Sequence, residues 1–175
     1  KRLRNGKDVV FITEGDPAIY STWSYLYQEI LNSEIGAEIE VEMVPGITSM
    51  SAAAAETLTP LIDGDERLAI VPATYGVSDI EAIFKENTKN NANVLNVLVD
   101  TLVLMKIGKN FSSVLQLLRE YNLLQHSILV SSATTKTQRI YRGAEMLDLP
   151  SNNIPYFSIM LIFLKNAKKR EGMQS

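Results

Sequence analysis

Two short turns carry the residue types best suited to holding a small ligand. The first, Gly15-Asp16-Pro17, directly follows residues 9–13, a run of β-branched and aromatic side chains that predicts a strand buried on both faces. At such a strand end, Gly15 would let a ligand approach the backbone, Asp16 could accept a hydrogen bond from a ribose hydroxyl, and Pro17 would stiffen the exit. Gly-Asp-Pro is also common turn chemistry, so a purely structural role stays open.

The second turn, Pro-Gly-Ile-Thr-Ser at residues 45–49, follows a segment at residues 37–44 in which glutamates alternate with apolar residues. That alternation predicts a strand with one solvated face, formed by Glu38, Glu40 and Glu42. Backbone amides at the start of the next helix could hold a carboxylate or an adenine edge. A rigid connector with a helix cap, supplied by a hydroxyl among residues 48–51, explains the same residues equally well.

Three further features have an ordinary structural interpretation beside a functional one. Met105 ends a predicted strand at residues 101–107, where a buried methionine usually fills a gap in the core. The small polar run at residues 133–139 is typical of a hydroxyl-rich hairpin turn. His126 precedes another predicted strand, and we interpret it as a surface loop residue and not as a catalytic base.

Composition excludes several kinds of chemistry. The 175 residues contain no cysteine and one histidine, which rules out thiolate metal sites, disulfides, a cysteine nucleophile and a multi-histidine metal centre. A net charge of −3 does not favour duplex nucleic acid as a partner. No apolar run reaches the roughly 20 residues that a membrane-spanning helix needs. We therefore expect a soluble, cytoplasmic protein that uses neither metal nor thiol.

The elements that position these residues alternate between helix and strand. Periodicity and capping signals predict helices at residues 21–32, 52–58, 78–87 and 111–121. Beyond the two segments above, apolar runs predict strands at residues 68–71, 101–107, 127–131, 139–142 and 156–164. Residues 87–96 read as a loop or weak helix and 165–175 as a solvated tail. This is an α/β pattern: residues 1–50 are predicted to be part of an N-terminal α/β domain and residues 51–175 a C-terminal mixed-sheet α/β domain.

Taken in order, five stretches resemble the tetrapyrrole (corrin/porphyrin) methylases, most closely the branch that methylates carbon 20 of precorrin-2 or cobalt-factor II. They are Gly-Asp-Pro-Ala-Ile-Tyr-Ser-Thr at 15–22, Val-Pro-Gly-Ile-Thr-Ser at 44–49, Val-Leu-Met-Lys at 103–106, Thr-Thr-Lys-Thr-Gln at 134–138 and Pro-Tyr-Phe-Ser at 155–158. The resemblance runs from Gly6 to about Lys165. The family's first strand and its Gly-x-Gly-Pro-Gly-Asp loop have no counterpart here. Because the opening residues also look like the last turn of a helix capped by Gly6, we interpret the chain as beginning inside a domain, as an incomplete enzyme.

The resemblance implies a two-domain tetrapyrrole methylase fold, a homodimer, S-adenosyl-L-methionine as cofactor, and methyl transfer to a tetrapyrrole in cobalamin (vitamin B12) biosynthesis. It implies no catalytic side chain and no metal, since cofactor and substrate bring the reactivity. The family's cofactor contacts fall here on Glu14, Gly15, Asp16, Ile19, Thr48, Ser49, Met105, Ala133 and Thr134.

A tetrapyrrole with many carboxylates would need basic residues at the edge of its cleft. The candidates that flank the matched stretches are Lys106, Lys136 and Arg139, with ordinary solvated charge as the alternative. Two other functions stay open: a diphthine-synthase-like methyltransferase of the same family, and a non-catalytic ligand-binding or dimerisation fragment. An RNA-methylating branch is disfavoured because the chain is not basic.

Overall fold

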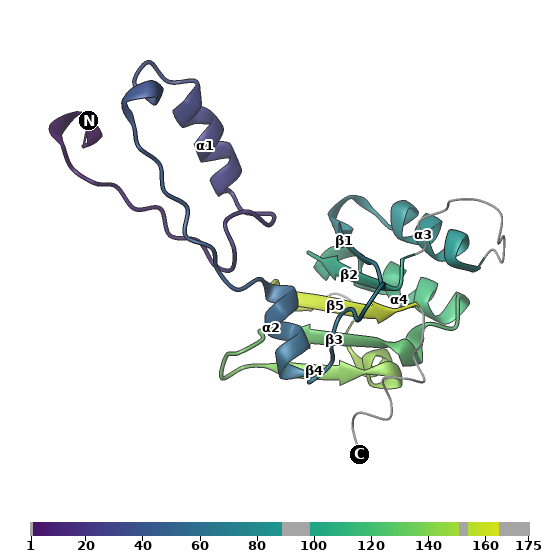
Figure 1. Cartoon of the computed structure of the whole chain (residues 1–175). Coiled ribbons are helices and arrows are strands. Elements are labelled where there is room, and N and C mark those ends of the chain that lie inside the picture. Colours follow the sequence, from purple (N-terminus) through teal and green to yellow (C-terminus); the bar gives the residue numbers. More distant parts are fainter. Residues whose placement is uncertain (1, 89–98, 151–153, 165–175) are drawn as a thin grey trace. The chain divides into compact units, whose positions relative to one another are not determined.

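The computed structural model describes residues 2–88, 99–150 and 154–164, and its contacts divide the chain into two compact units, Lys1–Ser49 and Met50–Ser175 (Figure 1). The predicted loop at residues 87–96 and tail at residues 165–175 lie almost wholly outside the described residues. That the two units are separate domains, divided near residue 50, stays a prediction. No helix among the described residues has the length and apolar character to cross a membrane.

Among its described residues, the first unit contains one α-helix, α1 (Trp23–Leu31), and two short 3-10 turns, Leu3–Asn5 and Gly36–Glu38. Before α1, the Ser21 hydroxyl accepts a hydrogen bond from the N–H of Trp23, the first residue of the helix, at 3.2 Å. Trp23 then packs between Phe11 and Tyr27, with ring centroids 5.8 and 5.7 Å apart. The Leu3–Asn5 turn ends at Gly6 in the left-handed conformation, so the predicted glycine cap is confirmed.

The two strands predicted in this unit are wrong. Residues 9–13 and 39–44 are not part of any β-ladder among the described residues, and residues 36–38 form a 3-10 turn instead. Val10 is 81% exposed and Ile12 87% exposed, so the first segment is not buried on both faces. A β-branched run favours an extended backbone, but a strand also needs a partner chain to satisfy its N–H and C=O groups. Within the described residues neither segment has one.

The second unit is built on a five-stranded mixed sheet in the order β1-β2-β5-β3-β4. Its strands are β1 (Leu68–Pro72), β2 (Thr101–Met105), β3 (Ser127–Ser131), β4 (Arg139–Arg142) and β5 (Ser158–Phe163). β1 and β2 are parallel, whereas β5 runs antiparallel to both β2 and β3, and β3 runs antiparallel to β4. The predicted α/β class with a mixed sheet is confirmed, and all five strands fall where the apolar runs placed them.

Helices cover both faces of this sheet (Figure 1). α3 (Ser78–Thr88) and α4 (Phe111–Glu120) pack on one face, against side chains such as Leu104 and Met160. α2 (Ser49–Glu56) packs on the other through Ala53, against alternate residues of the same strands, such as Val103 and Leu161. Because neighbouring residues of a strand point to opposite faces, each buried strand supplies both cores, which explains their continuous apolar sequences.

The strand directions bring one set of loops to a single edge of the sheet. β2 and β3 are both antiparallel to β5, so β1, β2 and β3 end at the edge where β4 and β5 begin. The register confirms this, because Met105 faces Ile159 and Ser131 faces Ser158. We call this the carboxyl edge; it carries Lys106, residues 132–138 and the residues that precede Ser158.

Candidate functional site

In the first unit the Gly-Asp-Pro turn is a side-chain-stabilised β-turn. The Ile19 N–H donates to the Asp16 backbone carbonyl at 3.2 Å, with Pro17 in the second position of the turn. The Ala18 N–H donates to Asp16 Oδ1 at 2.8 Å, which is the Asx arrangement expected for aspartate at the start of such a turn. Gly15 precedes it with φ +73°, a conformation that glycine adopts without steric cost.

The second oxygen of Asp16 reaches the other predicted turn. Asp16 Oδ2 accepts a hydrogen bond from the Gly46 N–H at 2.9 Å, across 30 residues of sequence. The backbones are so close here that a Cβ on Gly46 would lie 2.2 Å from the Gly15 carbonyl oxygen. We call residues 14–19 and 45–48 together the paired loops. Their contact explains why a glycine stands at position 46.

This geometry changes the interpretation of Asp16. The sequence suggests a carboxylate that accepts from a ribose hydroxyl, but both oxygens here accept backbone N–H groups of the paired loops. A carboxylate oxygen has two acceptor sites, so each Asp16 oxygen keeps one that these two bonds do not use. In the structure, the Asp16 carboxylate links the two loops, through one hydrogen bond within its own loop and one to the Gly46 N–H.

The other predicted cofactor residues of this unit lie within or directly beside the paired loops. Glu14 is exposed, whereas Ile19 and Thr48 are half-buried. Ser49 is the first residue of α2. The structure therefore gathers the first-unit candidates around one contact, and it leaves their ligand roles as predictions.

The second-unit candidates gather at the carboxyl edge. Met105 and Ala133 are both partly buried and pack against the same core cluster, the one that α2 covers. Thr134 is exposed and has φ +65°, while Lys106 and Ser132 have φ +55° and +51°. Left-handed backbone is uncommon for residues other than glycine and tends to cluster at functional sites. Three such residues at one edge mark it as a candidate ligand site.

Two contacts tie this edge to the start of β5. The hydroxyls of Ser131 and Ser158 lie 2.8 Å apart in a buried hydrogen bond. The Ser132 N–H donates to the Phe157 carbonyl at 2.7 Å. Sequence reasoning assigned no role to Ser131, Ser132 or Gln138, because neither a left-handed serine nor a contact between distant residues leaves a local signal in the sequence.

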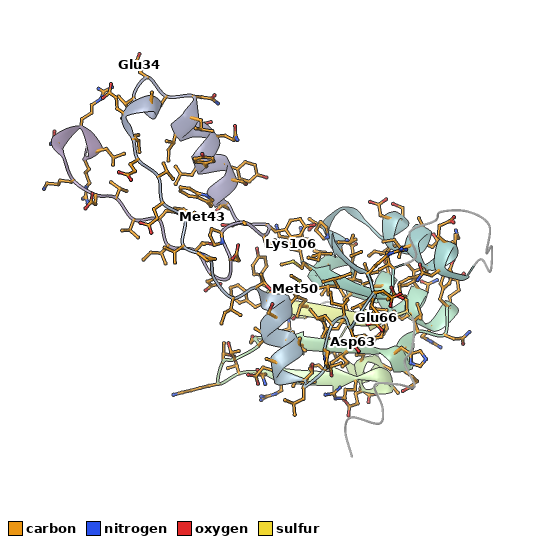
Figure 2. All side chains as sticks on the ribbon, viewed as in Figure 1. Glu34, Met43, Met50, Asp63, Glu66 and Lys106 are labelled. Atoms are coloured by element: carbon orange, nitrogen blue, oxygen red, sulfur yellow. The ribbon has the colours of Figure 1, made fainter. Side chains whose placement is uncertain are left out.

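The three basic candidates for substrate binding also lie at the carboxyl edge. Lys106 directly follows β2 (Figure 2), Lys136 lies in the β3–β4 loop, and Arg139 begins β4. All three are exposed, and Arg139 also donates to the Gln138 carbonyl at 2.8 Å. His126 lies in a 3-10 turn before β3, at the opposite edge of the sheet, and is half-buried. Glu38, Glu40 and Glu42 are exposed.

The chemistry available at these two places is recognition and not acid–base catalysis. The paired loops offer backbone groups at close approach, and the carboxyl edge offers hydroxyls, strained backbone and positive charge. Such groups bind and orient a polar ligand, whereas paired carboxylates in contrasting environments would indicate proton transfer.

Comparison with known proteins gives a consistent result. The family described as Tetrapyrrole (Corrin/Porphyrin) Methylases matches residues 1–146. The chain is 32% identical over 157 residues to the cobalt-precorrin-2 C(20)-methyltransferase of Salmonella typhimurium, covering 90% of this chain and 59% of that protein. It is 31% identical over 160 residues to the cobalamin biosynthesis protein CobIJ of Mycobacterium tuberculosis, covering 91% of this chain and 28% of that protein. The chain thus spans less than two thirds of the length of each of these relatives.

Solved structures share the fold. A cobalt precorrin-4 methyltransferase, CbiF, superposes with a TM-score of 0.67 at 23% identity, over 93% of this chain and 66% of that one. A uroporphyrin-III C-methyl transferase from Thermus thermophilus, crystallised with S-adenosyl homocysteine, gives a TM-score of 0.57 at 18% identity, over 89% of this chain and 64% of that one.

Proposed function

The chain belongs to the tetrapyrrole (corrin/porphyrin) methylase family, and from that premise we propose that it serves S-adenosylmethionine-dependent methyl transfer to a tetrapyrrole in cobalamin biosynthesis. The finer proposal is transfer to carbon 20 of precorrin-2 or cobalt-factor II. The observation that carries it is the 32% identity, over 90% of the chain, to a cobalt-precorrin-2 C(20)-methyltransferase.

The residues proposed to hold the cofactor are those that the sequence resemblance implies. They are Glu14, Gly15, Asp16, Ile19, Thr48, Ser49, Met105, Ala133 and Thr134. Two observations support their fitness for this role. Glycine at positions 15 and 46 lets the backbones of the paired loops approach each other closely, and the carboxyl edge presents hydroxyl and carbonyl oxygens on strained backbone.

When bound, S-adenosylmethionine supplies an electrophilic methyl group on a sulfonium, so no thiol, metal or acid–base pair is required of the protein. The chain's own residues would bind and orient the cofactor and the substrate, and would exclude water from them. Holding two reactants in line can supply about 7–11 kcal/mol of the barrier. Lys106, Lys136 and Arg139 are proposed to pair with substrate carboxylates, and the protein is proposed to act as a homodimer, as the family resemblance implies.

We expect the chain to bind S-adenosylhomocysteine with one site per chain, because the proposed cofactor residues come from its own paired loops and carboxyl edge. Ligand at about 100 times its dissociation constant would raise the free energy of unfolding by about 2.7 kcal/mol. Isothermal calorimetry and thermal unfolding measure both quantities. ATP is the control, because binding of ATP alone would indicate a different nucleotide-binding module. No heat and no thermal shift at millimolar S-adenosylhomocysteine would contradict the proposal.

The finer proposal is tested with the acceptor. Incubation with precorrin-2 and methyl-labelled S-adenosylmethionine should give a product labelled at carbon 20, as determined by NMR. A label at another carbon would agree with the methyltransferase activity proposed for the family but would contradict carbon 20 as the site of methylation. The chain spans 59% of the Salmonella relative, and turnover requires more of the site than cofactor binding does. Binding of the cofactor and turnover of the tetrapyrrole are therefore measured in separate experiments.

A third expectation concerns Thr48, which directly precedes α2 and is half-buried. If its hydroxyl contacts the ligand, Thr48→Ser keeps the affinity for S-adenosylhomocysteine. Thr48→Val keeps the shape but removes the hydroxyl, and should weaken binding by about 0.5–1.5 kcal/mol. Calorimetry measures affinity and thermal unfolding measures stability. A Thr48→Val protein with a lower melting temperature and unchanged affinity would assign the hydroxyl to helix capping instead.

A further inference from the structure

The loop between β3 and β4, residues 132–138, is held in a conformation that its sequence does not favour. Ser132 and Thr134 both have positive φ, and neither is glycine. Such residues persist only where surrounding contacts over-determine the backbone. Within the loop, the Thr135 N–H donates to the Ser132 carbonyl and the Gln138 N–H donates to the Thr135 carbonyl, each at 3.2 Å. These bonds close the loop on itself.

The side chain of Gln138 links this loop to α2. Its Oε1 accepts a hydrogen bond from the Thr134 N–H at 2.6 Å, and its Nε2 donates to Glu56 Oε2 at 2.7 Å. The Thr134 N–H can only donate, and an ionised Glu56 can only accept. An amide is the side chain that serves both at once, and the two partners fix its orientation. Thr134 is therefore anchored, through Gln138, to the last residue of α2.

We propose that Gln138 is a positioning residue, which holds Thr134 in its left-handed conformation so that the loop presents its ligand-binding atoms. This inference rests on the proposed function, in which Ala133 and Thr134 contact the cofactor. Because the Thr134 N–H is engaged by Gln138, contact with a ligand at this residue would come from its carbonyl or hydroxyl oxygen.

The test exchanges the two side chains. Gln138→Glu keeps an acceptor for the Thr134 N–H but places a second carboxylate against Glu56, so the loop should shift. Glu56→Gln keeps an acceptor for Gln138 Nε2. In the double variant Gln138→Glu with Glu56→Gln, the new glutamine donates to the new glutamate, and the arrangement is restored with its polarity reversed. Gln116→Glu, at an exposed position of α4, adds the same charge elsewhere and is the matched control.

We expect Gln138→Glu to raise the dissociation constant of S-adenosylhomocysteine about tenfold. Glu56→Gln, Gln116→Glu and the double variant should stay within about twofold of the wild type. A purely structural role would move the melting temperature without this pattern of loss and rescue in affinity. Equal affinity in all variants, or failure of the double variant to recover, overturns the positioning role.

A measurement without ligand separates this proposal from the proposed function. The Thr134 amide should exchange with solvent faster in Gln138→Leu than in the wild type, and the double variant should retain the slow rate, as observed by NMR. If the wild type binds no S-adenosylhomocysteine, the proposed function fails and the ligand role of Gln138 fails with it. The exchange rates then still decide whether Gln138 holds the loop. An unchanged rate in Gln138→Leu overturns that role.

Discussion

Replacing Gly46 with alanine is expected to weaken S-adenosylhomocysteine binding by roughly ten- to a hundredfold. The added Cβ would lie 2.2 Å from the Gly15 carbonyl oxygen and 3.0 Å from its carbonyl carbon. Both are backbone atoms, so the clash is relieved only if the paired loops separate. Overpacking of this kind typically has a free-energy penalty of about 1–3 kcal/mol, and each 1.4 kcal/mol is tenfold in affinity. Calorimetric titration of the variant measures the loss.

Gly36→Ala is the matched control for this prediction. Its Cβ would lie 2.5 Å from the Ile30 carbonyl oxygen, also a backbone atom of the first unit. Gly36 follows α1 and belongs to neither of the paired loops. It should therefore lower stability while the folded protein keeps its affinity. Equal losses of affinity in the two variants would show that general strain, and not the contact between the paired loops, controls binding.

The sheet of the second unit was predictable because its signals are local. Residues 127–131 and 139–142 are strands with the expected bounds, since an apolar run and a polar turn specify a hairpin without reference to distant residues. α4 falls within the predicted range of residues 111–121, with Val114, Leu117 and Leu118 in the core. The strand order with β5 between β2 and β3 was not predicted, because pairing between residues 27 to 62 positions apart leaves no periodic pattern.

The first unit shows the limit of the same reasoning. The sequence at residues 9–13 has strong β propensity, yet propensity describes fit to a pleated, half-buried surface and does not supply the partner strand. The alternation at residues 37–44 correctly indicated that the three glutamates are solvated, but Val41 and Met43, on the predicted apolar face, are exposed as well. It did not indicate pairing, because Glu38, Glu40 and Glu42 would be exposed in an extended segment as well as in a strand.

The candidate site was only partly visible in the sequence. Gly15, Asp16 and Gly46 were recognised as turn residues near a ligand, and the structure brings them into contact. The hydrogen bond from the Gly46 N–H to Asp16 joins residues 30 positions apart, so no local pattern in the sequence indicates it. A carboxylate in a Gly-Asp-Pro turn is equally suited to accept a hydrogen bond from a ligand or from a second loop. Similarly, nothing local distinguishes Gln138 from an ordinary polar residue of a hairpin.

The largest loss of stability is expected from Leu104→Ala. Leu104 lies on β2, is fully buried, and is paired with Val71 of β1 and Met160 of β5. It belongs to the core cluster that also contains Phe84 of α3 and Phe111 of α4. Truncation would therefore leave a cavity between the sheet and both helices on this face. Removing a buried leucine side chain in this way typically lowers the free energy of unfolding by about 2–5 kcal/mol.

Urea unfolding of Leu104→Ala measures this loss, with Leu147→Ala as the control. Leu147 is 43% exposed, so its truncation should change the free energy of unfolding by no more than about 0.5 kcal/mol. Leu104 directly precedes Met105, which ends β2 at the carboxyl edge, but its side chain belongs to the opposite core cluster from the one that Met105 packs against. The folded fraction of Leu104→Ala should therefore keep its affinity for S-adenosylhomocysteine. A loss below about 1 kcal/mol would contradict the central place of Leu104 in the core. A selective loss of affinity would instead show that the ligand site depends on the packing of both faces of the sheet.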